Sequence, residues 1–202
     1  MKEESMNISN LITQIRTLCK ETAALLKTAD SLVEKNGWST ITGSYTTSGN
    51  SSSLDDPIGW VPELLYRYYT NTEEYPNKLL YVAVILDNRY DNPAYPTGGK
   101  DKLEEPILTA GYFDYGDEKI VNNSVWKDVY CKGYFFSDGL SYDGSIVTLK
   151  PENMKCFSDK TTDGSLVNRK LKSLALPLID IKDTAKIEKS VIQPLLTDMI
   201  QS

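Results

Sequence analysis

An apolar run of strand length, residues 78–87, is the feature that most constrains the fold of this chain. It reads Lys-Leu-Leu-Tyr-Val-Ala-Val-Ile-Leu-Asp, and its apolar part, from Leu79 to Leu86, is the longest in the sequence. A helix that crosses a bilayer needs about 20 such residues, whereas a strand buried on both faces needs only about four to eight. The run therefore predicts a central strand covered on both faces, and no membrane partner.

Further strand segments follow the central run. Residues 106–115 are predicted to pair with it antiparallel, after a long polar excursion. Residues 126–136 and 145–149 flank Asp-Gly turn signals, which predict a hairpin. Residues 174–181 are predicted to form a last strand or an extended edge, because Pro177 cannot donate to a central ladder.

Apolar residues at helical spacing predict three helices. The first continues for seven turns and stops at Gly37, where glycine supports a left-handed end. A shorter helix is predicted over residues 61–72. The third begins at Asp183, which can cap it, and Pro194 should kink or divide it. The apolar positions are Ile8, Leu11, Ile12, Ile15, Leu18, Cys19, Leu25, Leu26, Ala29, Leu32 and Val33 in the first helix, and Ile187, Val191, Leu195 and Met199 in the last.

This order of elements predicts an α+β fold, since alternating βαβ units are missing. We expect an antiparallel sheet of about four to five strands, with the N-terminal and C-terminal helices packed on one face. Residues 1–6 are predicted to be a disordered tail and residues 7–202 a single α+β domain. Residues 39–56, rich in Ser and Thr, and residues 88–105, rich in Pro, Gly and charge, are predicted to be mobile polar insertions.

The sequence contains no histidine and three widely spaced cysteines. The missing histidine excludes Ser-His-Asp and Cys-His nucleophiles in their usual form and zinc sites that contain His. Cys19, Cys131 and Cys156 make a poor disulfide framework. Because the N-terminus also lacks an apolar signal segment, we expect a soluble protein of the reducing cytoplasm.

Negative charge gathers in the middle of the chain. The formal net charge is -6, and residues 38–75 sum to -4 while residues 76–125 sum to -3. Such a field would repel phosphates at close range. Direct binding to nucleic acid through a basic surface is therefore disfavoured.

Aromatic residues are candidates for a binding surface, because the chain has thirteen tyrosines and three tryptophans. Aromatic side chains supply a large contact area at low entropic cost, as ligand pockets and protein interfaces require. The competing interpretation is that they fill the core, since aromatic residues favour strands in any case. The binding residues predicted on the first interpretation are Trp60, Tyr66, Tyr69, Tyr112, Tyr115 and Trp126.

Carboxylates near strand ends are the candidates for metal ligands. Asp87 closes the central strand, Asp114 lies near the end of the next one, and Glu118 follows within Asp-Glu-Lys. Carboxylates hold Mg²⁺ or Mn²⁺, and a nearby lysine would support phosphodiester hydrolysis. The order resembles the acid-then-acid-x-lysine pattern of restriction-type nucleases. It departs from that family in lacking a βαβ layout and in having Gly116, which places the Asp-Glu-Lys group in a turn.

Two hypotheses about function follow. The favoured one is a non-catalytic binding or regulatory protein, without a cofactor, that engages a protein partner or a small ligand. Its surface would be acidic and tyrosine-rich, built from residues 38–125. The alternative is a divalent-metal-dependent phosphodiesterase or nuclease that uses Mg or Mn at the strand-end carboxylates.

Overall fold

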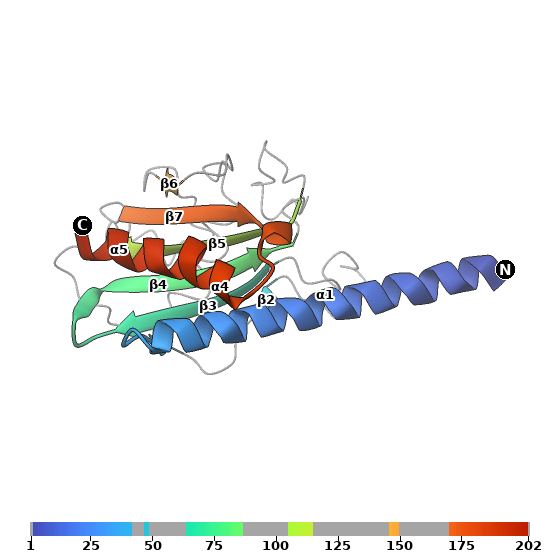
Figure 1. Ribbon diagram of the computed structural model, residues 1–202, viewed down its shortest axis with the longest axis horizontal. Coiled ribbons are helices and arrows are strands. Elements are labelled where there is room, and N and C mark those ends of the chain that lie inside the picture. Colours follow the sequence, from blue (N-terminus) through green and yellow to red (C-terminus); the bar gives the residue numbers. More distant parts are fainter. Residues whose placement is uncertain are drawn as a thin grey trace, which may run out of the picture.

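The computed structural model describes residues 2–41, 47–48, 64–86, 105–114, 146–149 and 170–201. Within these ranges an antiparallel sheet is accompanied by a long N-terminal helix and a C-terminal helical segment (Figure 1).

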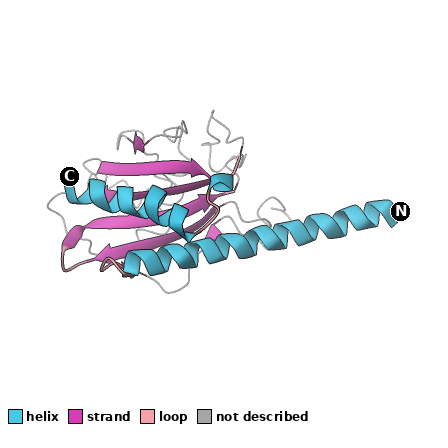
Figure 2. Ribbon diagram, viewed as in Figure 1, coloured by secondary structure: helices cyan, strands magenta, loops and turns pink. Residues whose placement is uncertain are grey.

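The described strands form one antiparallel sheet, which confirms the predicted α+β class (Figure 2). Neighbouring strands follow the order β1-β3-β4-β5-β7-β6, and β2 also pairs with β3. Four long strands form the middle of the sheet: β3 (Leu64–Asn71), β4 (Tyr75–Ile85), β5 (Ile107–Asp114) and β7 (Lys170–Pro177). Three short ones extend it: β1 (Ser39–Thr40), β2 (Thr47–Ser48) and β6 (Ile146–Leu149).

The central strand predicted from the apolar run is β4. Every residue from Leu79 to Ile85 is buried, so both faces of the strand are covered. Leu80 pairs with Tyr69 of β3 on one side and with Tyr112 of β5 on the other. The predicted antiparallel pairing of residues 106–115 with this strand is thereby confirmed.

The predicted N-terminal helix is α1 (Lys2–Glu34). It includes residues 2–6, assigned above to a disordered tail, where no proline or glycine interrupts the helix. It stops as predicted, because Gly37 has a φ of 81°. The C-terminal part of α1 lies beside the sheet, whereas its N-terminal part projects beyond it (Figure 1). Neither α1 nor any other helix in the described ranges is long and apolar enough to cross a membrane.

The C-terminal helical segment is interrupted near Pro194, as the sequence predicts. Asp183 caps its first helix, where the side chain accepts the Lys186 N–H at 2.8 Å. A π-helix lies immediately before Pro194, whose missing N–H removes one α-helical hydrogen bond. The elements are η6 (Leu178–Asp180, a 3-10 turn), α4 (Thr184–Ile187), η7 (Glu188–Ile192, the π-helix) and α5 (Gln193–Gln201).

Both helical segments pack on the same face of the sheet. Alternate residues of each strand point to this face and meet the helices in a single hydrophobic core. The core includes Leu26, Ala29, Leu32 and Val33 of α1; Leu65 and Tyr69 of β3; Leu80, Val82 and Val84 of β4; Leu108, Ala110 and Tyr112 of β5; and Ile187, Val191, Leu195 and Met199 of the C-terminal segment. The four apolar positions predicted for the last helix are therefore all core residues.

The predicted helix over residues 61–72 is wrong, because residues 64–71 form β3. Leu65 and Tyr69 point to the helix-covered face, and Tyr66 and Tyr68 point to the opposite face. Since both faces of the strand carry apolar residues, no polar alternation marks it as a strand.

The strand predicted at residues 174–181 begins earlier, at Lys170, and lies inside the sheet as β7. It pairs with β5 along its length and with β6 only from Leu171 to Leu174. Pro177 is its last residue and lies beyond β6, so its missing N–H interrupts no pairing there. Residues 126–136, the predicted hairpin partner of 145–149, lie outside the described ranges.

Candidate functional site

Two of the predicted binding tyrosines form hydrogen bonds between the sheet and the helices. Tyr69 is 0% exposed and donates to Asp30 Oδ1 of α1 at 2.8 Å. Tyr112 is 2% exposed and donates to Asp198 Oδ2 of α5 at 2.8 Å. Burial, together with the charge of Asp30, raises the pKa of Tyr69 far above its ordinary value, so its hydroxyl stays a neutral donor. Both side chains belong to the interior and offer no surface to a partner.

Tyr66 lies on the opposite face of the sheet and is also buried. It starts a row of aromatic rings through Tyr68, Tyr81 and Phe113, with successive centroids 5.5, 6.5 and 5.6 Å apart. These separations are typical of packed aromatic pairs in cores. The other three predicted binding residues lie outside the described ranges: Trp60, Tyr115 and Trp126.

Asp114, a predicted metal ligand, is engaged with nitrogen groups of β4. Its carboxylate accepts from Asn77 Nδ2 at 3.5 Å and lies 3.9 Å from Lys78 Nζ. No group of three His, Cys, Asp or Glu side chains in the described residues could hold a metal ion. Asp87 and Glu118 lie outside those residues, so the Mg or Mn site stays a prediction.

A second polar cluster joins α5 to β5 and β7. Lys172 Nζ lies 3.1 Å from Asp198 Oδ2, and Lys78 Nζ donates to the Met199 carbonyl at 2.9 Å. Burial raises the pKa of Asp198, but the hydrogen bonds from Tyr112 and Lys172 outweigh that effect and hold the pKa below its ordinary value. The cluster keeps a charged carboxylate at the helix-sheet contact, a structural role.

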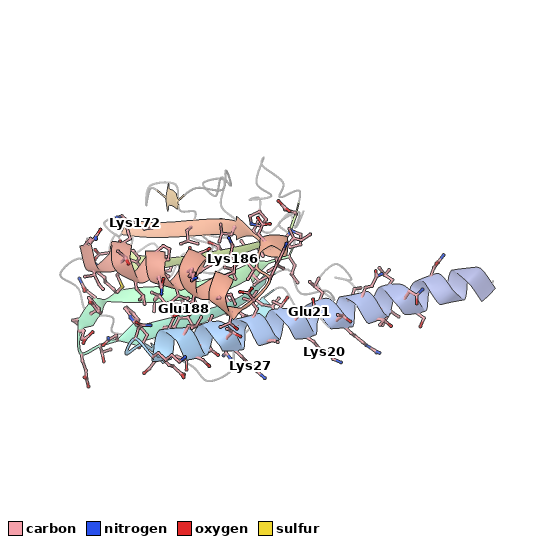
Figure 3. All side chains as sticks on the ribbon, in the orientation of Figure 1. Lys20, Glu21, Lys27, Lys172, Lys186 and Glu188 are labelled. Carbon is pink, nitrogen blue, oxygen red and sulfur yellow. The ribbon has the colours of Figure 1, made fainter. Side chains whose placement is uncertain are left out.

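Of the five large apolar side chains that are exposed in the described residues, three lie close together on the projecting part of α1, and the other two are Ile179 and Ile200. Ile8, Leu11 and Ile12 are 61%, 57% and 44% exposed, and Ile15 is partly exposed. We call these four residues the exposed stripe. The apolar positions of α1 continue along the same side of the helix into the core, where Leu26, Ala29, Leu32 and Val33 are at most 6% exposed. Lys20 and Lys27 point away from the sheet (Figure 3), and their spacing from the stripe puts them on the opposite side of the helix.

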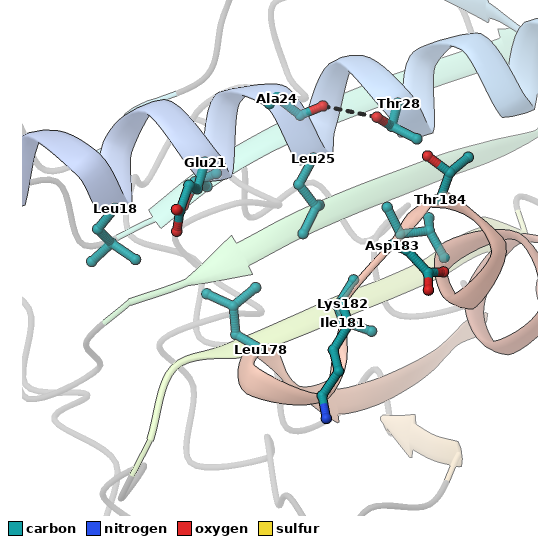
Figure 4. Close-up of a pocket in the computed structure, with 12 residues that line it drawn as sticks. Leu18, Glu21, Ala24, Leu25, Thr28, Leu178, Ile181, Lys182, Asp183 and Thr184 are labelled. Atoms are coloured by element: carbon teal, nitrogen blue, oxygen red, sulfur yellow. Dashed lines mark hydrogen bonds between the residues drawn. The ribbon is translucent and has the colours of Figure 1, made fainter.

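A groove of about 470 Å³ lies where the stripe meets the rest of the molecule (Figure 4). Leu18 and Leu25 of α1 form one wall, and Leu178, Ile181 and Ile187 line it from the other side. The exposed stripe and the groove therefore form a continuous surface along α1. Polar residues also contribute to the lining, namely Glu21, Thr22, Thr28, Lys182, Asp183 and Thr184.

Spacing alone could not reveal this surface. All eleven apolar positions of α1 share one stripe, and the pattern does not show which turns meet the sheet. One signal was present: residues 5–15 contain no charged side chain, although a quarter of the whole chain is charged.

No protein-family model, curated protein or solved structure matches this chain. The site is therefore interpreted from its own geometry.

Proposed function

We propose that this chain is a non-catalytic binding or regulatory protein whose α1 engages an amphipathic helix of a partner protein. The observation that carries the proposal is the exposure of Ile8, Leu11 and Ile12, at 61%, 57% and 44%. Burying an isoleucine or leucine side chain that is otherwise exposed contributes about 1.5–3 kcal/mol of favourable free energy. Contiguous apolar surface on a protein commonly marks a site of interaction.

The shape of the surface favours a helical partner. The exposed side chains recur every three and four residues along a straight helix, which forms the ridges and grooves that a second helix fits. The partner face should be apolar and weakly charged, because residues 5–15 offer no charge to pair with it.

The adjoining groove also falls within the volume range of small-molecule sites, so a small ligand is the second occupant that the geometry allows.

This proposal keeps the binding class predicted from the sequence and moves the surface. Tyr66, Tyr69 and Tyr112 are buried, so they cannot form the tyrosine-rich face expected of them. The exposed stripe offers the contact area that those residues do not.

Affinity capture with matched variants tests the proposal. Tagged wild-type chain should recover a protein that Leu11→Glu/Ile15→Glu fails to recover, since a buried unpaired charge is costly. Thr13→Glu/Thr17→Glu adds the same charges at exposed positions off the stripe and should recover the protein normally. Binding of the purified pair should then weaken at least about tenfold for the stripe variant alone. Equal recovery by both variants would contradict the proposal.

A further inference from the structure

We propose that the occupant of the exposed stripe is the same stripe of a second copy of this chain, paired antiparallel about a two-fold axis near Thr13. This inference rests on the function proposed above and names the partner. The two helices would form a short antiparallel coiled coil, and each exposed stripe would cover the other.

The spacing of the apolar residues fits a two-fold pairing. Ile8, Leu11, Ile15 and Leu18 stand at equal distances on either side of Thr13. In an antiparallel pair, Ile8 of one copy therefore meets Leu18 of the other, and Leu11 meets Ile15. A two-fold interface requires a patch that matches itself in this way. These positions follow the heptad spacing of coiled coils.

Charge does not oppose a second copy at this place. The chain carries -6 overall, so two copies repel each other at long range, but residues 5–15 contribute no charge to the contact. Gln14 of each copy would lie beside its counterpart across the axis, as an uncharged pair. Lys20 and Lys27 point away from the sheet (Figure 3), and helical spacing places them on the side of α1 opposite the stripe.

The pairing also continues a helix contact that the molecule already makes. The later part of the α1 stripe, through Ala29 and Val33, lies in the core with Val191 of the π-helix. The exposed part lacks such a cover in the described residues, and a second α1 would supply it in the same manner. The end of that second helix would reach Leu18 and the groove beside it.

The position of the sheet selects the antiparallel direction. α1 projects from one end of the sheet (Figure 1), so antiparallel helices place the two sheets at opposite ends of the pair. Parallel helices would bring both sheets to the same end. At that end the apolar positions of α1 after Leu25 are already covered by the sheet and helices of their own chain, so a parallel pair could not extend its contact there.

Sedimentation velocity on the full chain, from about 1 to about 200 µM, tests the inference in the range where weak pairs dissociate. Wild-type protein and Thr13→Glu/Thr17→Glu should reach the mass of a dimer. Leu11→Glu/Ile15→Glu should stay monomeric, with dimerisation weakened at least about 100-fold by buried like charges. Its circular dichroism should match the wild type, which separates loss of pairing from loss of fold.

Cross-linking distinguishes the two directions. With Cys19→Ser/Gln14→Cys, a short bis-maleimide should join residue 14 of one copy to residue 14 of the other, as identified by peptide mass spectrometry. Wild-type Cys19 should not join Cys19 of the second copy, because the two lie about 18 Å apart along antiparallel helices. A Cys19–Cys19 product would overturn the antiparallel arrangement.

Other outcomes separate this inference from the proposed function. A monomer at every concentration, or a dimer that the stripe variant leaves intact, overturns self-pairing. If that monomer still captures a different protein through the stripe, the proposed function stands and only the second copy is excluded. If nothing at all depends on the stripe, both fail.

Discussion

Asp30 connects α1 to β3 through two different partners. Its carboxylate accepts from Tyr69 at 2.8 Å and lies 3.1 Å from Arg67 Nη2. Arg67 Nε and Nη1 are buried and have no hydrogen-bond partner in the described part of the chain. The sequence could not predict this pair, because a helix over residues 61–72 would have placed Arg67 one turn from Glu63, at the surface.

Replacing Asp30 should therefore lower the free energy of unfolding more than replacing Arg67. Asp30→Ala leaves the guanidinium buried with no carboxylate, which should lower the free energy of unfolding by about 3 kcal/mol. Arg67→Met also removes two unpaired donors and leaves Asp30 with Tyr69, so its effect should be nearer to about 1 kcal/mol. Urea denaturation of the two variants measures the difference, and the reverse order would contradict this account.

Tyr81 makes stability sensitive to alkaline pH, because burial raises its pKa to about 12. Below about pH 9 the residue is protonated in both the folded and the unfolded state. Between pH 10 and 12 the unfolded state loses the proton more readily than the folded state, so this group lowers the free energy of unfolding by about 1 kcal/mol per pH unit. Tyr69 acts in the same direction.

The variant Tyr81→Phe isolates this contribution. Between pH 10 and pH 11 it should lose about 1 kcal/mol less stability than the wild type, measured from urea midpoints at a series of pH values. Below about pH 9 the two curves should run parallel, since neither state titrates there. Parallel curves through pH 11 would show that Tyr81 ionises as easily in the folded protein as in the unfolded one.

At the scale of elements, predictability followed how distinctive each pattern was. β4, β5, α1 and the C-terminal helices carry a long apolar run, a clear helical period or a cap, and the structure confirms them. β3 carries apolar residues on both faces at spacings that also fit a helix, so only tertiary packing decides its form.

Gly111 of β5 fits a place where strand packing leaves no room for a side chain. A Cβ there would meet the carbonyl oxygen of Lys172 and would lie 2.6 Å from Tyr81 Cε1. Gly111→Ala should therefore destabilise the protein by about 3 kcal/mol or more, since a backbone oxygen cannot move aside as a side chain can. Ala110→Gly, the neighbouring control, should cost about 1 kcal/mol. Denaturation curves compare them, and a neutral Gly111→Ala would contradict the close contact.

The cap at Asp183 provides a test of the C-terminal helices. Asp183→Ala leaves the Lys186 N–H without its acceptor and should cost about 1 kcal/mol. Asp183→Ser keeps an acceptor at the same position and should recover most of that loss. Thermal denaturation of the three proteins makes the comparison, and an equal loss in both variants would argue against capping.

At the scale of the whole molecule, the candidate site depends on an arrangement that no local pattern contains. The layers, with two helical segments over one face of an antiparallel sheet, follow from the order of elements. The exposed stripe arises because α1 is longer than the sheet it covers (Figure 1). The helix period predicts Ile8 and Leu11 to be as buried as Leu26, and only the position of the sheet separates them.

Pairing of two chains through α1 should also change how the protein melts. Since the folded pair binds what the unfolded chain does not, the thermal midpoint should rise with protein concentration. Leu11→Glu/Ile15→Glu should melt at the same temperature at every concentration. Differential scanning fluorimetry over about a hundredfold range of concentration measures both. A wild-type midpoint that does not move would count against the pair.

One face of the sheet is covered by two helical segments that are far apart in the sequence, α1 and residues 184–201. α1 precedes the strands of the sheet in the sequence and residues 184–201 follow them, yet both contribute to one core over β4 and β5. During synthesis the apolar side chains of that face, Leu80, Val82 and Val84 among them, therefore stay incompletely covered until residues 184–201 have left the ribosome. A chaperone that recognises extended apolar segments would find its target in this interval, and release should coincide with the docking of α5.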